Sequence, residues 1–252
     1  MITLFCLPCA GGSASMYFPW QAALQGVARL QAIELPGRGR RVREALLQDY
    51  GVLVNRLADE LAGAAAPSSG YVLFGHSMGG LLAQGLARAL PQRGWPAPRA
   101  LMISACAAPL AREWIAPDDS DAALIAAMRR QGGTRDEVFD CPELLELALP
   151  VLRADYRVCA SFQAQRPAGE MAALLDLPVH VYGGVSDPVG AAPLQAWQRE
   201  THGPVTLDWF DGGHFYLQAR QDELLARLRR HLQAHANNST PDADHAAALA
   251  HA

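Results

Sequence analysis

A serine in a glycine-flanked turn is the residue of this sequence best placed for nucleophilic chemistry. Four apolar residues at 71–74 run directly into Gly-His-Ser-Met-Gly at 75–79, and a helical pattern continues to residue 90. This order predicts a buried strand, a sharp turn and a helix, the nucleophile elbow that presents a serine hydroxyl at the edge of a sheet. The flanking glycines let neighbouring backbone pass close to the turn. Because a serine hydroxyl is a weak nucleophile, Ser77 needs a base within hydrogen-bond reach.

Two later strands are expected to supply the base and the acid that orients it. Asp187 follows an apolar strand expected at 178–184, and His214 follows a strand expected at 205–210. Since the carboxyl ends of parallel strands meet at one edge of a sheet, both residues should lie beside the elbow. Asp211 is the alternative acid, but it is only three residues from His214 and would need the loop to fold back. We therefore predict a catalytic triad of Ser77, Asp187 and His214.

The tetrahedral intermediate of such a reaction needs two backbone amides to bind its oxyanion. Met78 is expected to supply one, because the first amides of a helix and its positive dipole end point back toward the serine. The second should come from the loop at 8–12, where Ala10 is the preferred donor and Cys9 the alternative. His76 lies inside the elbow, and its side chain is expected to point away from the proton of Ser77.

The elements that position these residues alternate along the chain. Strands are expected at 2–8, 29–35, 71–76, 100–106, 178–184 and 205–210, and helices at 16–24, 46–66, 78–90, 191–201 and 217–231. The strands are continuous apolar runs, as expected for a sheet that is covered by helices on both faces. The alternation predicts an α/β protein with a doubly wound, mostly parallel sheet. Together with the elbow, this is the α/β-hydrolase fold.

One block interrupts the alternation. Residues 109–167 show no strand pattern and contain helical pieces at 121–131, 142–152 and 154–163. An insertion of this size after a central strand is expected to lie over the carboxyl ends of the strands as a helical lid. A helical subdomain with no role in access is the alternative. We thus expect a single domain at 1–234 with a lid insertion at 109–167, followed by a disordered polar and Ala-rich tail at 235–252.

Composition narrows the class of protein. The chain has 252 residues and a formal charge of −4, and its 21 basic residues are all Arg, so neither nucleic-acid binding nor membrane attachment through basic residues is expected. The apolar run at 2–7 is too short for a signal peptide or a membrane span, which indicates a cytoplasmic protein. Five cysteines without framework spacing fit a reducing compartment. Cys6 and Cys9 have redox-motif spacing, but they lie at the end of a strand and not at a helix N-terminus, so a packing role is favoured.

Five separated motifs carry a family resemblance that covers nearly the whole chain apart from the tail. They are Leu-Pro-Cys-Ala-Gly-Gly-Ser-Ala at 7–14, Glu-Leu-Pro-Gly-Arg-Gly at 34–39, Phe-Gly-His-Ser-Met-Gly-Gly at 74–80, Arg-Ala-Asp-Tyr at 153–156 and Asp-Gly-Gly-His-Phe at 211–215. In this order they resemble the type II thioesterases that accompany nonribosomal peptide and polyketide synthases. One departure is Cys9, which stands where the family usually has an aromatic residue or His.

The resemblance implies hydrolysis of thioesters carried on the 4′-phosphopantetheine arm of carrier proteins, which clears stalled or mis-primed acyl groups. The resemblance assigns Ser77 as the nucleophile, His214 as the general base and then the general acid, and Asp187 as the residue that orients His214. No metal or redox cofactor is implied, and we expect a monomer. A serine carboxylesterase acting on small free esters, acyl transfer to another acceptor, and a non-catalytic carrier-protein-binding protein stay open as alternatives.

A cluster of four arginines follows the second strand. It could bind an acidic carrier protein or the phosphate of its arm. A solvated Arg-rich loop is the reading that the sequence alone favours. The four residues are Arg38, Arg40, Arg41 and Arg43.

Overall fold

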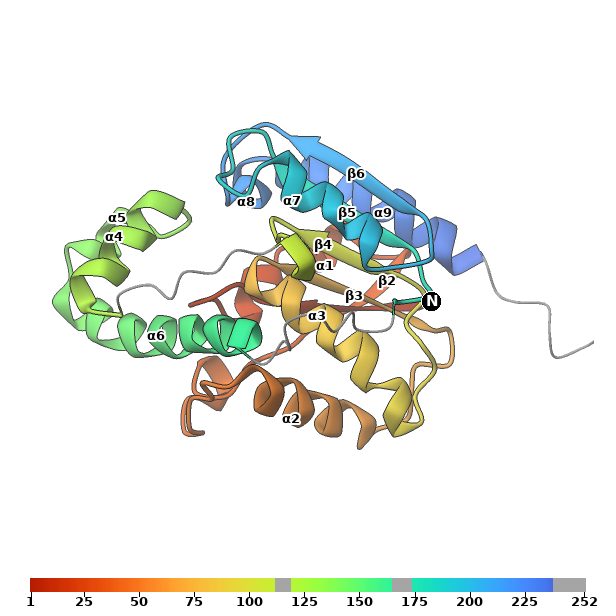
Figure 1. Cartoon of the computed structure of the whole chain (residues 1–252), viewed down its shortest axis with the longest axis horizontal. Coiled ribbons are helices and arrows are strands. Elements are labelled where there is room, and N and C mark those ends of the chain that lie inside the picture. The colour runs from red at the N-terminus through yellow and green to blue at the C-terminus, as the bar shows by residue number, and fades with distance from the viewer. Residues whose placement is uncertain (112–118, 165–173, 238–252) are drawn as a thin grey trace, which may run out of the picture.

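The computed structural model describes residues 1–111, 119–164 and 174–237. In this part of the chain, six strands form one parallel sheet in the order β2-β1-β3-β4-β5-β6, with helices on both faces (Figure 1). The predicted doubly wound parallel sheet is confirmed, and the strand ends differ from the predicted ends by at most three residues. The strands are β1 (Ile2–Leu7), β2 (Ala28–Ala32), β3 (Tyr71–His76), β4 (Leu101–Ser104), β5 (Val179–Gly184) and β6 (Val205–Phe210).

The central strands are buried on both faces, which explains their continuous apolar sequence. Every residue of β1, β3, β4 and β5 is buried, whereas the edge strand β6 has exposed and partly exposed positions. The chain moves from β1 outward to β2 and then returns past β1 to β3. The loops that follow β1 and β3 therefore diverge at the point where the strand order reverses, the usual place for a ligand site in an open parallel sheet.

Helices α2 and α3 cover one face of the sheet, and α1 and α9 cover the other (Figure 1). Helix α2 begins at Tyr50, four residues after the predicted start, because the Asp49 side chain accepts a hydrogen bond from the amide of Val52 and caps the helix there. The helices outside the insertion are α1 (Trp20–Ala23), α2 (Tyr50–Ala62), α3 (Met78–Ala89), α7 (Ala191–Gln195), α8 (Tyr216–Ala219) and α9 (Gln221–Asn237).

The helix predicted at 16–24 is divided in two. A 3-10 turn at Ala14–Tyr17 precedes α1, which starts only after Pro19. Proline lacks an amide hydrogen and is tolerated at a helix start but not in its interior, so the division falls at this residue.

The described part of the insertion forms a lobe beside the core, at the left of Figure 1, and contains the helices α4 (Asp121–Gln131), α5 (Asp136–Phe139) and α6 (Pro142–Ala164). The bounds of α4 are those predicted. The predicted break between residues 152 and 154 is wrong, because α6 runs through without interruption and holds Pro150 in its interior. Leu149 and Leu152 pack against α4, and this burial offsets the backbone hydrogen bond that the proline cannot make.

The last helix extends further than predicted. His235, placed by the sequence in a disordered tail, belongs to α9, where its Nε2 atom lies 2.8 Å from Nε2 of His180 on β5. Arg99 donates a hydrogen bond to the carbonyl of His235, and the ring of His231 stacks on that of His180 with 3.9 Å between centroids. These contacts fasten the end of α9 to the sheet. The rest of the predicted tail, 238–252, lies outside the described residues.

This histidine cluster should make the fold sensitive to acid. Burial, with the positive charge that His231 and His235 would add, lowers the pKa of His180 to about 3. The unfolded imidazole titrates near 6.5, so the stabilisation from a neutral His180 is complete above that pH and is lost as the pH falls toward 3. We expect His180 alone to lower the free energy of unfolding by about 2 to 3 kcal/mol between about pH 7 and about pH 4.

Urea unfolding followed by circular dichroism at both pH values measures this loss. His180→Gln, which keeps polar contacts with Thr206 and His235, should show a smaller loss than the wild type. His202→Gln, in an exposed loop, is the matched control and should keep the wild-type pH dependence. Equal losses in His180→Gln and the wild type would contradict the assignment. Asp208 and Arg227, which lie beside His231, are unchanged in both variants.

Candidate active site

The turn between β3 and α3 places Ser77 in a strained backbone conformation. Its φ of 54° and ψ of −117° lie in the left-handed half of backbone space, which costs a residue with a side chain about 1 to 3 kcal/mol. The amide of Ser77 donates to the carbonyl of Ser104 at 2.8 Å, which fixes the corner to β4. A Cβ on Gly75 would lie 2.0 Å from the carbonyl oxygen of Gly79, and one on Gly79 would lie 2.2 Å from the carbonyl oxygen of Leu7. Both flanking positions therefore require glycine.

The structure brings the three predicted triad residues together. Nε2 of His214 lies 3.0 Å from Oγ of Ser77, and Nδ1 lies 3.0 and 3.1 Å from the two carboxylate oxygens of Asp187. Both His214 and Asp187 are buried. With Nδ1 donating to the carboxylate, Nε2 is left as the acceptor for the serine hydroxyl. This arrangement allows proton transfer from Ser77 to His214.

Asp187 lies in this line of hydrogen bonds and Asp211 does not. Asp211 is exposed and forms an ion pair with Arg220 at 2.6 Å. The loop of Asp187 is held against that of His214, since the amide of residue 186 donates to the carbonyl of Gly212 at 2.9 Å. A Cβ on Gly184 would lie 2.4 Å from the carbonyl oxygen of residue 213, so the two loops can approach this closely only because glycine ends β5.

The loop after β1 forms a tight turn next to the elbow. The amide of Gly12 donates to the carbonyl of Cys9 at 3.0 Å, and the amide of Gly11 donates to Oδ2 of Asp155 at 2.7 Å. Within the described residues no acceptor pairs with the amide of Ala10. Burial raises the pKa of the Cys9 thiol to about 12, so this cysteine is a packed thiol and not a thiolate nucleophile.

A buried polar chain lies behind the triad. Nδ1 of His76 is 2.9 Å from Oγ of Ser104, which is 2.6 Å from the hydroxyl of Tyr216. Burial lowers the pKa of His76 well below its ordinary value, so its ring is neutral beside the ring of His214, with 5.2 Å between centroids. Ser104 and Tyr216 were not predicted from the sequence. The available signals were the position of Ser104 at the end of β4 and that of Tyr216 directly after the Asp-Gly-Gly-His-Phe motif.

A cavity of about 460 Å³ opens between the loop that follows β1 and the insertion. Ala10 and Gly11 line one side, Leu152 of α6 and Met128 of α4 line the other, and Phe215 closes it next to His214. Its walls are thus formed by both the core and the helices of the insertion. A second cavity of about 260 Å³ lies between α2, α3 and the C-terminal part of α6.

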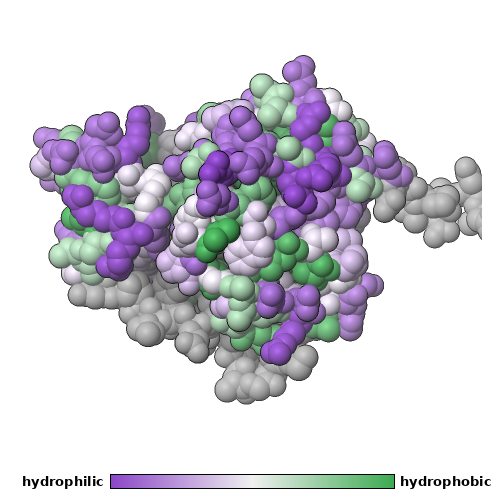
Figure 2. All heavy atoms as spheres, turned by 90° about the horizontal axis from the view of Figure 1, so that it is seen from above, coloured by the Kyte–Doolittle hydropathy of each residue, from purple (hydrophilic) through white to green (hydrophobic). Residues whose placement is uncertain are grey.

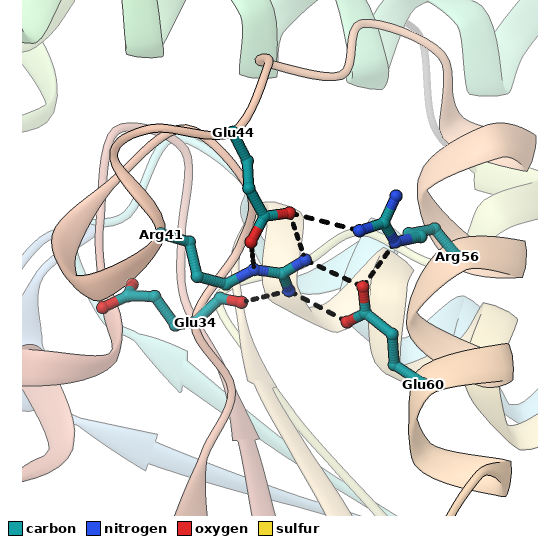
Figure 3. Close-up of polar contacts among 5 residues, drawn as sticks. All are labelled: Glu34, Arg41, Glu44, Arg56 and Glu60. Atoms are coloured by element: carbon teal, nitrogen blue, oxygen red, sulfur yellow. Dashed lines mark hydrogen bonds and ion pairs between the residues drawn. The ribbon is translucent and has the colours of Figure 1, made fainter.

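The arginine cluster expected after β2 is divided by the fold. Arg41 braces its own loop to α2: it contacts Glu44 at 2.7 Å and Glu60 at 2.8 Å, and it donates to the carbonyl of Glu34 at 3.0 Å (Figure 3). Arg38 is buried and pairs with Asp155. The interpretation of these two residues as part of an exposed basic cluster is wrong. The exposed members are Arg40 and Arg43.

Neither a metal centre nor a membrane span is found in the described ranges. No group of three or more His, Cys, Asp or Glu side chains there could hold a metal ion. None of the helices described is long and apolar enough to cross a membrane. The face seen from above in Figure 2 mixes hydrophilic and hydrophobic residues, and hydrophilic ones cover much of the lobe at the left.

A parallel sheet that carries serine on a strand-to-helix turn, with a carboxylate and histidine after later strands, is the architecture of the α/β-hydrolases. The model of the thioesterase domain family matches residues 2–232. The thioesterase PikA5 of Streptomyces venezuelae is 35% identical, over 96% of this chain and 84% of its own length.

Solved structures agree with this likeness. The type II thioesterase BorB from the borrelidin biosynthetic cluster is 38% identical with a TM-score of 0.78, covering 91% of this chain and 92% of its own. ClbQ from the colibactin NRPS/PKS pathway is 28% identical with a TM-score of 0.82, covering 93% and 98%. The chain belongs to the thioesterase family and is a thioester hydrolase. The resemblance to type II thioesterases drawn from the five motifs is confirmed.

Gly79→Ala tests the close packing of the elbow. The new Cβ would meet the carbonyl oxygen of Leu7, which cannot move without displacing β1. We expect the free energy of unfolding to fall by about 2 kcal/mol or more, measured by urea denaturation. Gly63→Ala, at the end of α2, is the control, because its Cβ would have ordinary contacts of 3.4 Å and longer. Its stability should stay within about 0.5 kcal/mol of wild type. Equal stability of the two variants would contradict the packing argument.

Proposed function

We propose that this enzyme hydrolyses acyl groups from the 4′-phosphopantetheine arm of carrier proteins of a nonribosomal peptide or polyketide synthase. The observation that carries the proposal is the unbroken line from Ser77 Oγ through His214 to Asp187, with successive distances of 3.0 and 3.0 Å. Relatives named for biosynthetic clusters support the substrate class. In such a cluster the enzyme would remove stalled or mis-primed acyl units.

The first half of the proposed reaction acylates the enzyme. As Oγ of Ser77 bonds to the thioester carbonyl carbon, Nε2 of His214 takes the hydroxyl proton, and Asp187 stabilises the imidazolium that forms. The carbonyl oxygen becomes an oxyanion, which the amides of Ala10 and Met78 bind. When the intermediate collapses, the carbon–sulfur bond breaks, and His214 returns the proton to the departing thiol of the arm.

The second half frees the acyl group. Water attacks the acyl-Ser77 ester while His214 accepts one of its protons, and the same two amides bind the second oxyanion. Collapse of this intermediate breaks the bond to Ser77, and His214 restores the proton to the serine oxygen. The neutral state of His76 supports this cycle, because a second positive charge next to the His214 imidazolium would oppose its formation.

The insertion at 109–167 is proposed to act as a lid within a single domain at 1–234. Its helices α4 and α6 form one wall of the 460 Å³ cavity, and the loop at 9–12 forms another, which supports a role in holding the acyl chain. We also propose that the enzyme works as a monomer, since all site residues come from one chain. A cytoplasmic location is proposed because the five cysteines lack the spacing of a disulfide framework, which fits a reducing compartment.

Ser77→Ala should abolish turnover and leave the fold intact, because covalent catalysis cannot proceed without the hydroxyl. Release of free thiol from an acylated carrier protein, followed with a thiol reagent, measures the rate. Thermal unfolding checks that the variant is folded. A variant that keeps even about a tenth of the rate would contradict an acyl-enzyme route, since loss of a nucleophile typically costs several orders of magnitude.

Asp187→Asn should reduce kcat by about 10⁴-fold, because the amide holds the imidazole in the wrong tautomer and cannot stabilise its charge. Asp211→Asn is the matched control: it removes an exposed carboxylate in the neighbouring loop and should change kcat by less than about twofold. If Asp211→Asn were the more damaging change, the assignment of the acid would be reversed.

The substrate class is tested with carrier proteins loaded with acyl groups of graded length. Intact-mass measurement before and after incubation shows which acyl groups are removed. We expect kcat/KM for the best carrier-bound substrate to exceed that for p-nitrophenyl esters of the same acyl group. A preference for the free esters would favour the carboxylesterase reading, and release of the acyl group as a conjugate instead of an acid would show transfer to another acceptor.

A further inference from the structure

A buried ion pair connects the lid to the loop that follows β1. Asp155 lies on α6, and its side chain is 1% exposed; Arg38, from the loop after β2, is 7% exposed. The guanidinium binds the carboxylate through two hydrogen bonds, Nη1 to Oδ2 at 2.5 Å and Nη2 to Oδ1 at 2.7 Å. The two residues are 117 positions apart in the sequence. Burying two charges costs desolvation free energy. The hydrogen bonds that the pair makes must offset this cost.

The same pair also binds the backbone of the loop. Oδ2 of Asp155 accepts from the amide of Gly11 at 2.7 Å, and Nη1 of Arg38 donates to the carbonyl of Gly12 at 3.2 Å. Gly11 has a φ of +73°, a backbone conformation that glycine adopts more readily than residues with a Cβ. The two side chains therefore fix two consecutive residues of the turn.

These bonds determine which amide stays available. The Gly11 amide is directed to Asp155, the Gly12 amide is directed to the carbonyl of Cys9, and the Ala10 amide has no acceptor among the described residues. Without an acceptor for Gly11, the glycine would let the peptide between residues 10 and 11 rotate, and the direction of the turn would no longer be fixed. The placement of Asp155 thus sets the geometry of one half of the oxyanion site.

We propose that Asp155, held by Arg38, is a positioning residue that fixes the loop at 9–12 so that the Ala10 amide faces the oxyanion. The proposal rests on the proposed oxyanion role of Ala10. Because Asp155 belongs to α6, the oxyanion site is complete only when the lid helix is seated on the core. The lid then has two roles: it helps to place the Ala10 amide, and it forms a wall of the cavity.

Two double variants separate this role from that of a structural ion pair. Arg38→Met with Asp155→Asn removes both charges and keeps an oxygen for the Gly11 amide. Arg38→Met with Asp155→Leu removes the same charges and leaves that amide without an acceptor. The two variants differ only at residue 155, so a difference between them reports on the bond to Gly11.

The readout is the rate at which diisopropyl fluorophosphate phosphorylates Ser77, followed by intact mass. Oγ of Ser77 bonds to phosphorus, fluoride leaves, His214 takes the proton, and the phosphoryl oxygen occupies the oxyanion position. We expect Arg38→Met with Asp155→Leu to react at least about 30-fold more slowly than the Asn double variant, since loss of one oxyanion donor typically costs 10² to 10³. KM for a p-nitrophenyl ester should change less than about twofold, because ground-state binding does not use this amide.

The outcomes are distinct. Equal phosphorylation rates in the two double variants, both folded, would overturn the positioning role. A wild-type enzyme that the reagent does not label would instead contradict the proposed function, whichever way the variants behave.

If the Leu variant melts below the assay temperature, Asp155→Glu replaces it. This variant keeps the charge opposite Arg38 but displaces the carboxylate from the Gly11 amide, and it should react at least about tenfold more slowly than wild type. A wild-type rate in a folded Asp155→Glu would also overturn the proposal. Asp119→Asn is the control, since it breaks the exposed ion pair of Arg157 on the same helix α6 and should leave the rate unchanged.

Discussion

The hydrogen bond between Ser77 and His214 is the contact on which the proposed mechanism depends. It joins groups 137 residues apart at 3.0 Å, and neither residue has a local reason to adopt its position. Ser77 has a positive φ, which is unfavourable for a residue with a side chain. His214 follows a different strand, at the carboxyl edge of the same sheet. The fully buried strands between them provide the rigidity that keeps this distance short. The strain energy of the Ser77 backbone is small compared with the stabilisation that burial of the core provides.

A buried ion pair connects the insertion to the loop next to this centre. The carboxylate of Asp155, which is 1% exposed, binds the Arg38 guanidinium and a backbone amide of the loop that follows β1. By contrast, the contacts of Arg41 lie nearer the surface and brace a loop to α2 without reaching the site (Figure 3). Arg38 and Arg41 are only three residues apart, but they bind different parts of the structure because their side chains leave the loop in different directions.

Much of the fold and of the candidate site could be predicted from the sequence, because the patterns involved are local. Apolar runs locate the six strands, and Gly-His-Ser-Met-Gly after one of them locates the turn of Ser77. Asp187 could be distinguished from Asp211 by its distance along the chain from His214. The burial of Arg38 could not be predicted, because its partner Asp155 lies in a distant helix and no spacing rule connects them. The continuity of α6 through Pro150, and the place of His235 in α9, likewise depend on packing that appears only in three dimensions.

The central claim is that the turn between β3 and α3 places Oγ of Ser77 next to His214 and next to two backbone amides that bind the oxyanion. A crystal structure of the enzyme carrying a phosphonate on Ser77 tests it most directly, because the phosphonyl oxygen copies the oxyanion. We predict this oxygen within hydrogen-bond distance of the Met78 and Ala10 amides, with His214 still bound to Asp187. A phosphonate on another residue, or an oxygen directed to solvent and away from both amides, would contradict the account.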